Sequence, residues 1–250
     1  MLIKNLFRYP VKGLSAEALT ETILAPGQAI AWDRAFALAQ GDAPFDPAAP
    51  AFLPKSNFMC LMRNGRIALL DARFTADPPR LTITAPDATA VTADPTMPAG
   101  RAIIARFLTN YLGGEARGTP VFQHAPGHSF GDQRAPVVSL LNRASLRAFE
   151  ADLGATREEA RFRANILFDA EPAWQEFAWV GRRLQVGDAV LEVTKRTVRC
   201  AAVEVNPATG ARDADPIREL RRLYDHADLG IHATVVAGGR IAPGNSITIL

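Results

Sequence analysis

The chain has 250 residues, of which 48% are hydrophobic and 22% charged, and its net charge is +2. This length allows one large domain or two smaller ones with a full core, and the balanced charge argues against a nucleic-acid partner. Two cysteines are too few for a disulfide framework, no apolar run approaches the ~20 residues that span a bilayer, and the first residues lack the pattern of a signal peptide. A soluble, cytoplasmic protein without a membrane partner is therefore expected.

The first half is predicted to be rich in strands. Apolar runs bounded by turn residues predict strands over residues 2–9, 35–39, 67–70 and 81–84, with a Pro/Ala-rich loop over 41–54. One helix is predicted over 103–112, because Ile104, Leu108 and Leu112 recur at helical spacing before Gly113. Residues 118–131 are expected to form a loop that contains one strand.

In the second half, residues that typically begin or end helices and strands are easier to identify. A strand is predicted over 136–141, followed by a helix that Asn142 caps and Gly154 ends. A short helix after Thr156, a buried strand over 165–168 and an amphipathic helix over 217–224 follow, and two similar turns precede strands near residues 190 and 247. We expect a mainly β (α+β) protein, with a β-barrel-like domain over 1–115 and a second β-barrel with short helices over 116–250.

The sequence lacks the motifs that are typical of several classes of enzyme. The sequence contains no glycine-rich dinucleotide loop, no P-loop, no nucleophile elbow and no zinc-protease helix motif. The histidines at 124 and 128 flank a Pro-Gly turn and are not expected to bind metal. Cys60 has apolar neighbours and is expected to be a small buried hydrophobe.

Cys200 is the strongest candidate for a reactive side chain. It follows a run that contains Lys195, Arg196 and Arg199, and neighbouring cations favour the thiolate form, which is the nucleophile and the ligand for soft metals. If the segment is a strand, however, Lys195 and Cys200 point to opposite faces. A reactive thiol and a core cysteine therefore both remain open from these residues alone.

Other cations could form an anion site beside Cys200. Arg163 and Asn165 stand two residues apart at the start of an apolar strand, so they should point the same way and offer donors to phosphate or carbonyl oxygens. Lys12 ends the first strand and Arg34 follows a turn. Each could be an ordinary surface cation, and together they form a site only if the fold gathers them.

These motifs, in this order, resemble the MOSC family, named after the C-terminal domain of molybdenum cofactor sulfurase. The resemblance covers nearly the whole chain, including the N-terminal β-barrel domain that accompanies MOSC domains. The family also includes amidoxime-reducing proteins. The motifs that carry it are Tyr9-Pro10-Val11-Lys12, Asp33-Arg34-Ala35-Phe36, Arg163-Ala164-Asn165, Arg199-Cys200 and Pro207-Ala208-Thr209-Gly210.

The resemblance implies a pterin-type molybdenum cofactor (molybdopterin). Cys200 would then be the catalytic residue and the thiolate ligand of molybdenum, and the cationic residues would balance the negative charge of the phosphate and dithiolene. Asp132 lies near a further acidic position of the family. The expected cofactor-binding residues are Lys12, Arg34, Asn142, Arg163, Asn165 and Arg199.

Two positions depart from the family pattern. Gly13 follows Lys12 where the amidoxime reducers commonly have serine, and Lys55 stands where arginine is frequent, so a point charge replaces a bidentate fork. The 250 residues contain no ferredoxin-like domain, and we therefore expect a redox activity to use a separate electron-donor protein.

The resemblance leads to three hypotheses about function. The first is an oxidoreductase that reduces small N-hydroxylated or related N–O compounds. The second is a sulfur carrier or transferase that holds a persulfide on Cys200. The third is a non-catalytic anion-binding module, which the departures at Gly13 and Lys55 leave open.

Overall fold

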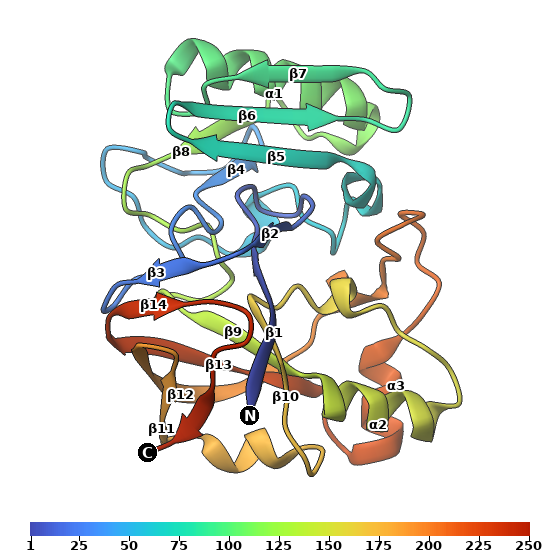
Figure 1. The fold of residues 1–250 in the computed structure, drawn as a ribbon. Helices are drawn as coiled ribbons and strands as arrows, with labels where there is room; N and C mark the ends of the chain where they lie inside the picture. The colour runs from blue at the N-terminus through green and yellow to red at the C-terminus, as the bar shows by residue number, and fades with distance from the viewer.

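The largest element of the structure is an eight-stranded sheet in the order β15-β11-β12-β13-β9-β10-β1-β2. The computed structural model describes residues 1–250. The sheet lies in the lower half of Figure 1 and consists of β1 (Leu2–Arg8), β2 (Glu17–Leu19), β9 (Val138–Asn142), β10 (Ile166–Asp169), β11 (Arg183–Val186), β12 (Ala189–Val198), β13 (Asp228–Ala237) and β15 (Ile247–Ile249).

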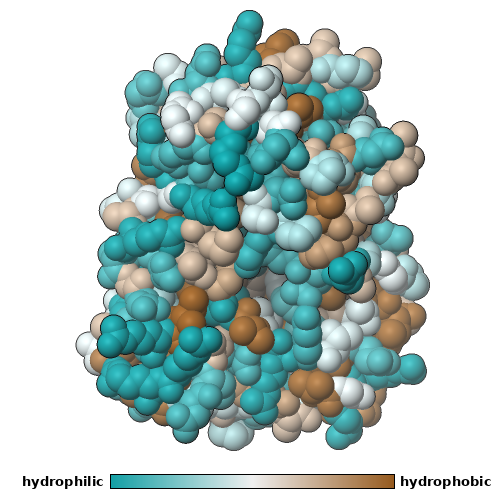
Figure 2. Space-filling view, turned by 180° about the vertical axis from the view of Figure 1, so that it is seen from behind, coloured by the Kyte–Doolittle hydropathy of each residue, from teal (hydrophilic) through white to brown (hydrophobic).

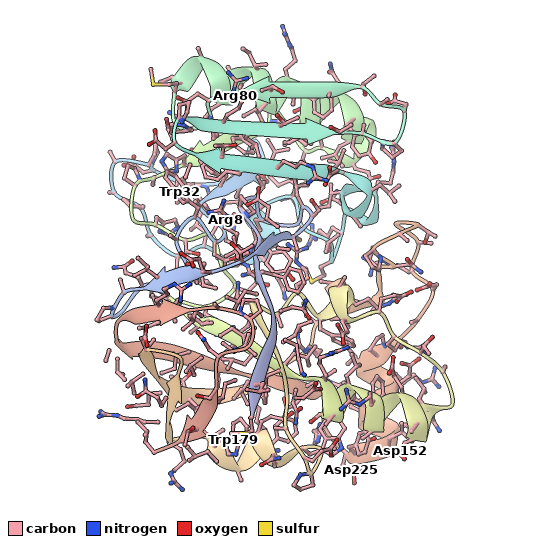
Figure 3. All side chains as sticks on the ribbon, in the orientation of Figure 1. Arg8, Trp32, Arg80, Asp152, Trp179 and Asp225 are labelled. Carbon is pink, nitrogen blue, oxygen red and sulfur yellow. The ribbon has the colours of Figure 1, made fainter.

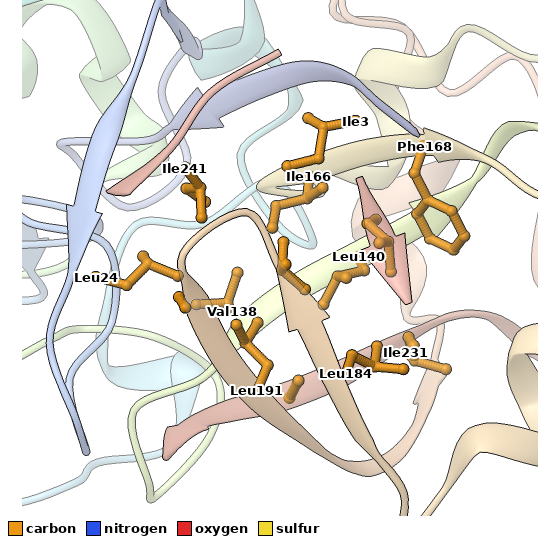
Figure 4. Close-up of a cluster of buried hydrophobic side chains, with 14 of the residues drawn as sticks. Ile3, Leu24, Val138, Leu140, Ile166, Phe168, Leu184, Leu191, Ile231 and Ile241 are labelled. Atoms are coloured by element: carbon orange, nitrogen blue, oxygen red, sulfur yellow. The ribbon is translucent and has the colours of Figure 1, made fainter. Parts of the chain in front are cut away.

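The two ends of the chain close this sheet. The backbone N–H of Ile247 donates to the carbonyl of Met1 at 2.8 Å, and that of Ile3 donates to Asn245 at 3.0 Å. The last strand therefore returns to the first one, and both termini lie close together in Figure 1. Inward-facing side chains of every second residue fill the interior, among them Ile3, Leu140 and Ile231 (Figure 4).

Two helices lie at one end of the sheet, and the sequence predicts both of them. In α2 (Arg143–Leu153) the Asn142 side chain accepts a hydrogen bond from the Ala144 N–H, and Gly154 ends the helix with φ 73°. Leu146 and Phe149 of this helix and Leu220 of α3 (Pro216–Tyr224) belong to one buried cluster. The third predicted helix, after Thr156, is only a single 3₁₀ turn over Glu159–Phe162.

The upper half of Figure 1 has its own core. Helix α1 and the aromatic residues of β4 and β8 pack against a three-stranded sheet there. The elements of this half are β4 (Phe36–Ala39), β5 (Asp71–Ala76), β6 (Pro79–Thr84), β7 (Ala90–Ala93), α1 (Pro98–Leu112) and β8 (Val121–His124), while β3 (Thr22–Leu24) pairs with β14 (Gly239–Ile241). The expected mainly β fold is confirmed.

The first strands of the chain connect the two halves. β1 pairs with β10, and Arg8 at its end donates to the carbonyl of Phe74 in β5 at 3.2 Å. Figure 3 labels Arg8 and Trp32 in this junction, where the ring of Trp32 lies 4.9 Å from that of Phe74. The domain boundary near residue 115 stays a prediction, because the first strands pack with the second half.

One predicted strand is wrong. Residues 67–70 lie largely in a 3₁₀ helix (Gly65–Leu69), in which Ile67 N–H donates to the Asn64 carbonyl and Leu70 N–H to that of Ile67. The segment after Cys200 is also a 3₁₀ turn (Ala201–Glu204). Its apolar residues alternate as in a strand, but Val203 and Val205 are buried in two different cores.

The surface of the molecule carries both hydrophilic and hydrophobic residues, as is usual for a folded domain. On the face shown in Figure 2, hydrophobic residues stand singly or in small groups among hydrophilic ones. No helix is both long and apolar enough to cross a bilayer.

Candidate functional site

A pocket of about 440 Å³ opens between the two halves of the molecule, a size that suits a small-molecule ligand. Residues from both halves line it. Seven of its lining side chains are cationic and only two are carboxylates, so the pocket favours anions. The charged residues are Lys12, Arg34, Lys55, Arg134, Arg161, Arg163 and Arg199 with Asp33 and Asp132.

Cys200 lines this pocket as a half-buried free thiol. β12 ends at Val198, so Cys200 lies beyond the strand and strand alternation does not decide its direction. Lys195 does not line the pocket, and its ammonium donates to Gln133 at 2.5 Å. Lys55 is a cation near the sulfur: burial alone would lower the pKa of this lysine, but the nearby Cys200 raises it.

Asp33 organises the wall of the pocket beside Arg34. The Asp33 carboxylate accepts hydrogen bonds from the Tyr9 N–H at 2.8 Å and from the Asn165 amide at 3.1 Å, and it forms an ion pair with Arg34. Arg34 also donates to the carbonyl of Arg163 at 3.2 Å. These contacts join residues 33–34 to residues 163–165, which are far apart in the sequence.

Arg34 and Arg163 both stack on Tyr9. Their guanidinium carbons lie 4.7 Å and 4.3 Å from the centre of the Tyr9 ring, a cation–π distance. Arg163 has a left-handed backbone with φ 51° and precedes β10. The expectation that Arg163 and Asn165 point the same way from one strand is therefore wrong, although both line the pocket.

Asn165 is fully engaged within the protein. Its amide nitrogen donates to Phe7 and Asp33, and its oxygen accepts from the backbone and hydroxyl of Ser139. Asn165 has 1% of its surface exposed. It holds Asp33, and through it Arg34, in position and has no free polar group for a ligand.

Arg163 and Arg199 are partly buried cations without an ion pair. Burial lowers the pKa of each guanidinium to about 10. Arg163 donates to the carbonyl of Leu14 at 2.8 Å, and Arg199 donates to those of Phe162 and Leu229. Carbonyl oxygens and aromatic rings stabilise these charges, but neither guanidinium has a carboxylate partner. A partly desolvated charge without a counter-ion is costly, and an anionic ligand in the pocket would offset this cost.

Unpartnered polar atoms mark the same wall. Thr197 Oγ1, Arg199 Nε and His232 Nδ1 are buried without a hydrogen-bond partner, and all three residues line the pocket. Burial and the charge of Arg199 lower the pKa of His232 to about 3, so its imidazole is neutral at physiological pH. Buried polar atoms are rarely left unpaired, so this wall is suited to a polar ligand or to ordered water.

Lys12 and Lys55 both lie beside Asp132. Lys12 forms an ion pair with Asp132 and donates to the Phe130 carbonyl at 2.8 Å, while the Lys55 ammonium lies 3.9 Å from the same carboxylate. Burial lowers the pKa of Lys12, and Asp132 opposes this shift. Asp132 thus holds two cations at the pocket wall.

Asn142 does not belong to the pocket, and its predicted contact with a cofactor is corrected. Its side chain is completely buried, caps α2 and donates to the Ala170 carbonyl at 2.9 Å and to Glu176 at 3.0 Å. The capping signal was correct, but the same amide also serves a buried network that no local pattern predicts.

Cys60 is buried, as the sequence predicts, with 6% of its surface exposed. It also lines the same pocket as Cys200, which its apolar neighbours in the sequence do not indicate. Burial raises the pKa of its thiol, and the charge of Lys12 opposes this effect. Tyr9 and Asp33 are functional residues that the sequence analysis did not identify. Their places in the same short motifs as Lys12 and Arg34 were the only signals for them.

Gly13 has a structural reason to be glycine. Its φ is +87°, and a Cβ at this position would lie 2.6 Å from the Cδ1 atom of Ile67. A residue with a side chain, such as serine, would therefore be strained by the positive φ and would require the Ile67 side chain to move.

Two family profiles match this chain: the MOSC N-terminal beta barrel domain over residues 1–115 and the MOSC domain over residues 125–248. Molybdenum cofactor sulfurase of Drosophila mojavensis is 30% identical over 84 residues, which are 34% of this chain and 10% of the relative. That of Drosophila grimshawi is 33% identical over 119 residues, 44% of this chain and 15% of the relative. The chain thus spans only about a tenth of the length of most such relatives.

Two solved structures are more distantly similar. The superposition on the YUAD protein from Bacillus subtilis covers 100% of this chain and 96% of that protein, with a TM-score of 0.42 and 12% identity. YiiM from Geobacillus stearothermophilus covers 45% of this chain and 53% of its own length, with a TM-score of 0.36 and 15% identity. The assignment rests on the sequence profiles, which together match nearly every residue: the chain belongs to the MOSC family.

Proposed function

We propose that the pocket binds a pterin-type molybdenum cofactor, with Cys200 as the thiolate ligand of the metal. The observation that carries this proposal is the combination of a soft sulfur ligand and an excess of cationic side chains in one pocket. The unpaired charges of Arg163 and Arg199 and the unpartnered polar atoms beside them fit an anionic ligand with several polar groups.

The residues of the pocket divide into contacts and supports. Lys12, Arg34 and Arg163 would hold the phosphate and the polar edge of the pterin, since cations bind phosphate and carbonyl oxygens. Asn165 and Asp33 would keep Arg34 in place through their existing hydrogen bonds. Arg199, whose outer nitrogens already bind carbonyls, would add positive charge beside Cys200.

The proposed reaction is the two-electron reduction of an N-hydroxylated compound. The bound cofactor supplies a metal centre that can exchange two electrons with the substrate. The N–O bond breaks, two protons and two electrons are taken up, and the products are the N–H compound and water. The electrons come from a separate donor protein, and the pocket between the halves holds the small-molecule substrate.

An aromatic amidoxime tests this reaction directly. The protein is reconstituted with molybdenum cofactor, supplied with a chemical reductant, and the amidine product is measured. Wild type should form the amidine, Cys200→Ser and Arg163→Gln should lose most of this activity, and Arg240→Gln, which affects only a surface pair with Glu21, should retain it. A molybdenum-loaded wild type that forms no amidine or related product contradicts the proposed reaction.

A sulfur carrier is the second candidate, favoured by the relatives that are named molybdenum cofactor sulfurases. In that case Cys200 would hold a persulfide. Incubation with a cysteine desulfurase and its substrate should then add the mass of one sulfur atom to wild type and not to Cys200→Ser. Tight cofactor binding with neither activity would instead indicate a binding module.

A further inference from the structure

The backbone directly after Cys200 is a single 3₁₀ turn, Ala201–Glu204. Cys200 is its N-terminal flanking residue and accepts a hydrogen bond from the Val203 N–H at 3.0 Å. Because the turn is so short, its own hydrogen bonds leave carbonyl groups that need other donors. The position of the Cys200 backbone therefore depends on what holds this turn.

Arg161 binds the far end of the turn from the second half of the molecule. Its guanidinium donates to the carbonyl of Glu204 at 3.2 Å and lies 3.5 Å from that of Val203. Ion pairs with Glu158 and Asp213 fix this guanidinium, which is only 3% exposed.

Arg212 binds the near end of the turn and reaches across to the first half. One of its terminal nitrogens donates to the carbonyl of Ala201, the residue after Cys200, at 2.9 Å. The other donates to the carbonyls of Leu61 at 3.1 Å and Met62 at 2.5 Å, on the opposite wall of the pocket. A single planar group thus connects the backbones of both walls.

The packing around Arg212 supports the same connection. Val205 pairs with Arg212 in a β-bridge, and its side chain is buried in the core of the first half. The loop that carries Arg212 approaches the first half so closely that a Cβ on Gly65 would lie 2.5 Å from the carbonyl oxygen of Gly210. The turn after Cys200 is therefore docked on the first half, with Arg212 as its polar link.

We propose that Arg212 is a positioning residue for Cys200, because it fastens the turn that follows the cysteine to the opposite wall of the pocket. The proposed function gives this role its importance, since a metal ligand must be held at a fixed place relative to the cations of both walls. Arg212 itself is not among the residues that line the pocket.

The rate at which iodoacetamide alkylates Cys200 tests this role in cofactor-free protein. A Cys60→Ser background leaves Cys200 as the only thiol. Arg212→Met should increase the alkylation rate by about fivefold, because the turn opens more often once its cross-pocket hydrogen bonds are lost. Arg212→Lys should restore part of the wild-type rate, since one ammonium can bind some of the same carbonyls.

Two matched variants separate this role from a general loss of charge or stability. Glu204→Gln removes the ion pair with Arg212 but keeps its bonds to the carbonyls, and Arg183→Met removes an exposed pair with Glu192. Both should alkylate within about twofold of wild type. Hydrogen exchange should accelerate in Arg212→Met over residues 61–64 and 201–205 together, and less elsewhere.

The outcomes distinguish this inference from the proposed function. If Arg212→Met alkylates at the wild-type rate and its exchange over 61–64 and 201–205 is unchanged, the positioning role is wrong, even if wild type binds molybdenum. If alkylation and exchange accelerate as expected while wild type binds no molybdenum, Arg212 holds the turn and the proposed cofactor is wrong.

Discussion

The amide of Asn165 donates a hydrogen bond of 3.1 Å to the carboxylate of Asp33, a residue 132 positions earlier in the chain. This contact joins the Asp-Arg motif of the first half to the Arg-x-Asn motif of the second. As a result, Arg34 and Arg163 lie on the ring of Tyr9 and face the same pocket as Cys200. The cationic wall is thus built by contacts between the halves.

Removal of the Asp33 carboxylate should be strongly destabilising. Its side chain is 2% exposed and serves Arg34, the Tyr9 N–H and Asn165 at once. Asp33→Ala leaves the Arg34 charge without its ion-pair partner and the Tyr9 N–H without its side-chain acceptor, so we expect a loss of about 3–5 kcal/mol in the free energy of unfolding. Asp71→Ala, which breaks an exposed pair with Arg73, should cost less than about 1 kcal/mol. Urea unfolding of both variants measures the difference, and similar small losses would contradict the role of Asp33.

A side chain at position 13 should strain the turn after Lys12. Gly13→Ala is expected to cost about 2 kcal/mol, because of the positive φ and the contact with Cδ1 of Ile67. Ile67→Val removes that atom, so Gly13→Ala should cost less in the Ile67→Val background than in wild type. A double-mutant cycle by urea unfolding measures the coupling. Strictly additive losses would show that Ile67 is not the obstacle.

The buried carboxyl of Glu176 should make stability depend on pH. Burial raises the pKa of Glu176, although Asn142 and Ser145 donate to its carboxylate and oppose the shift. A carboxyl whose pKa is higher in the folded state stabilises the fold while it is protonated, and this contribution is lost as the pH rises through the folded-state pKa. Glu176→Gln stays neutral and should remove this loss.

Unfolding free energies of wild type and Glu176→Gln between about pH 5 and 8 test this sign. Relative to the variant, wild type should become less stable as the pH increases. A constant difference across this range would mean that Glu176 does not titrate there, and the opposite slope would contradict the effect of burial.

Local patterns predicted the elements whose signals lie within a few residues. Asn142 and Gly154 mark the ends of α2, and the spacing of Ile104, Leu108 and Leu112 marks the buried face of α1. The residues chosen from the family motifs, with the exception of Asn142, do line one pocket. Their roles there as ligands remain predictions.

The remaining features depend on contacts between distant segments, which no local pattern contains. Cys60 has apolar neighbours in the sequence but reaches the pocket, because its turn forms part of the opposite wall. Val203 and Val205 alternate like strand residues, yet they enter separate cores. The bonds of Arg212 to Leu61 and Met62 likewise exist only once both halves are folded.

The molybdenum content of purified protein, measured by mass spectrometry after reconstitution with the cofactor and removal of excess, tests the central claim most directly. We expect stoichiometric molybdenum in wild type and in the surface variant Arg240→Gln, and a large loss in Cys200→Ser. A wild type without molybdenum, or a Cys200→Ser variant that retains it as firmly as wild type does, would contradict the assignment of Cys200 as the metal ligand.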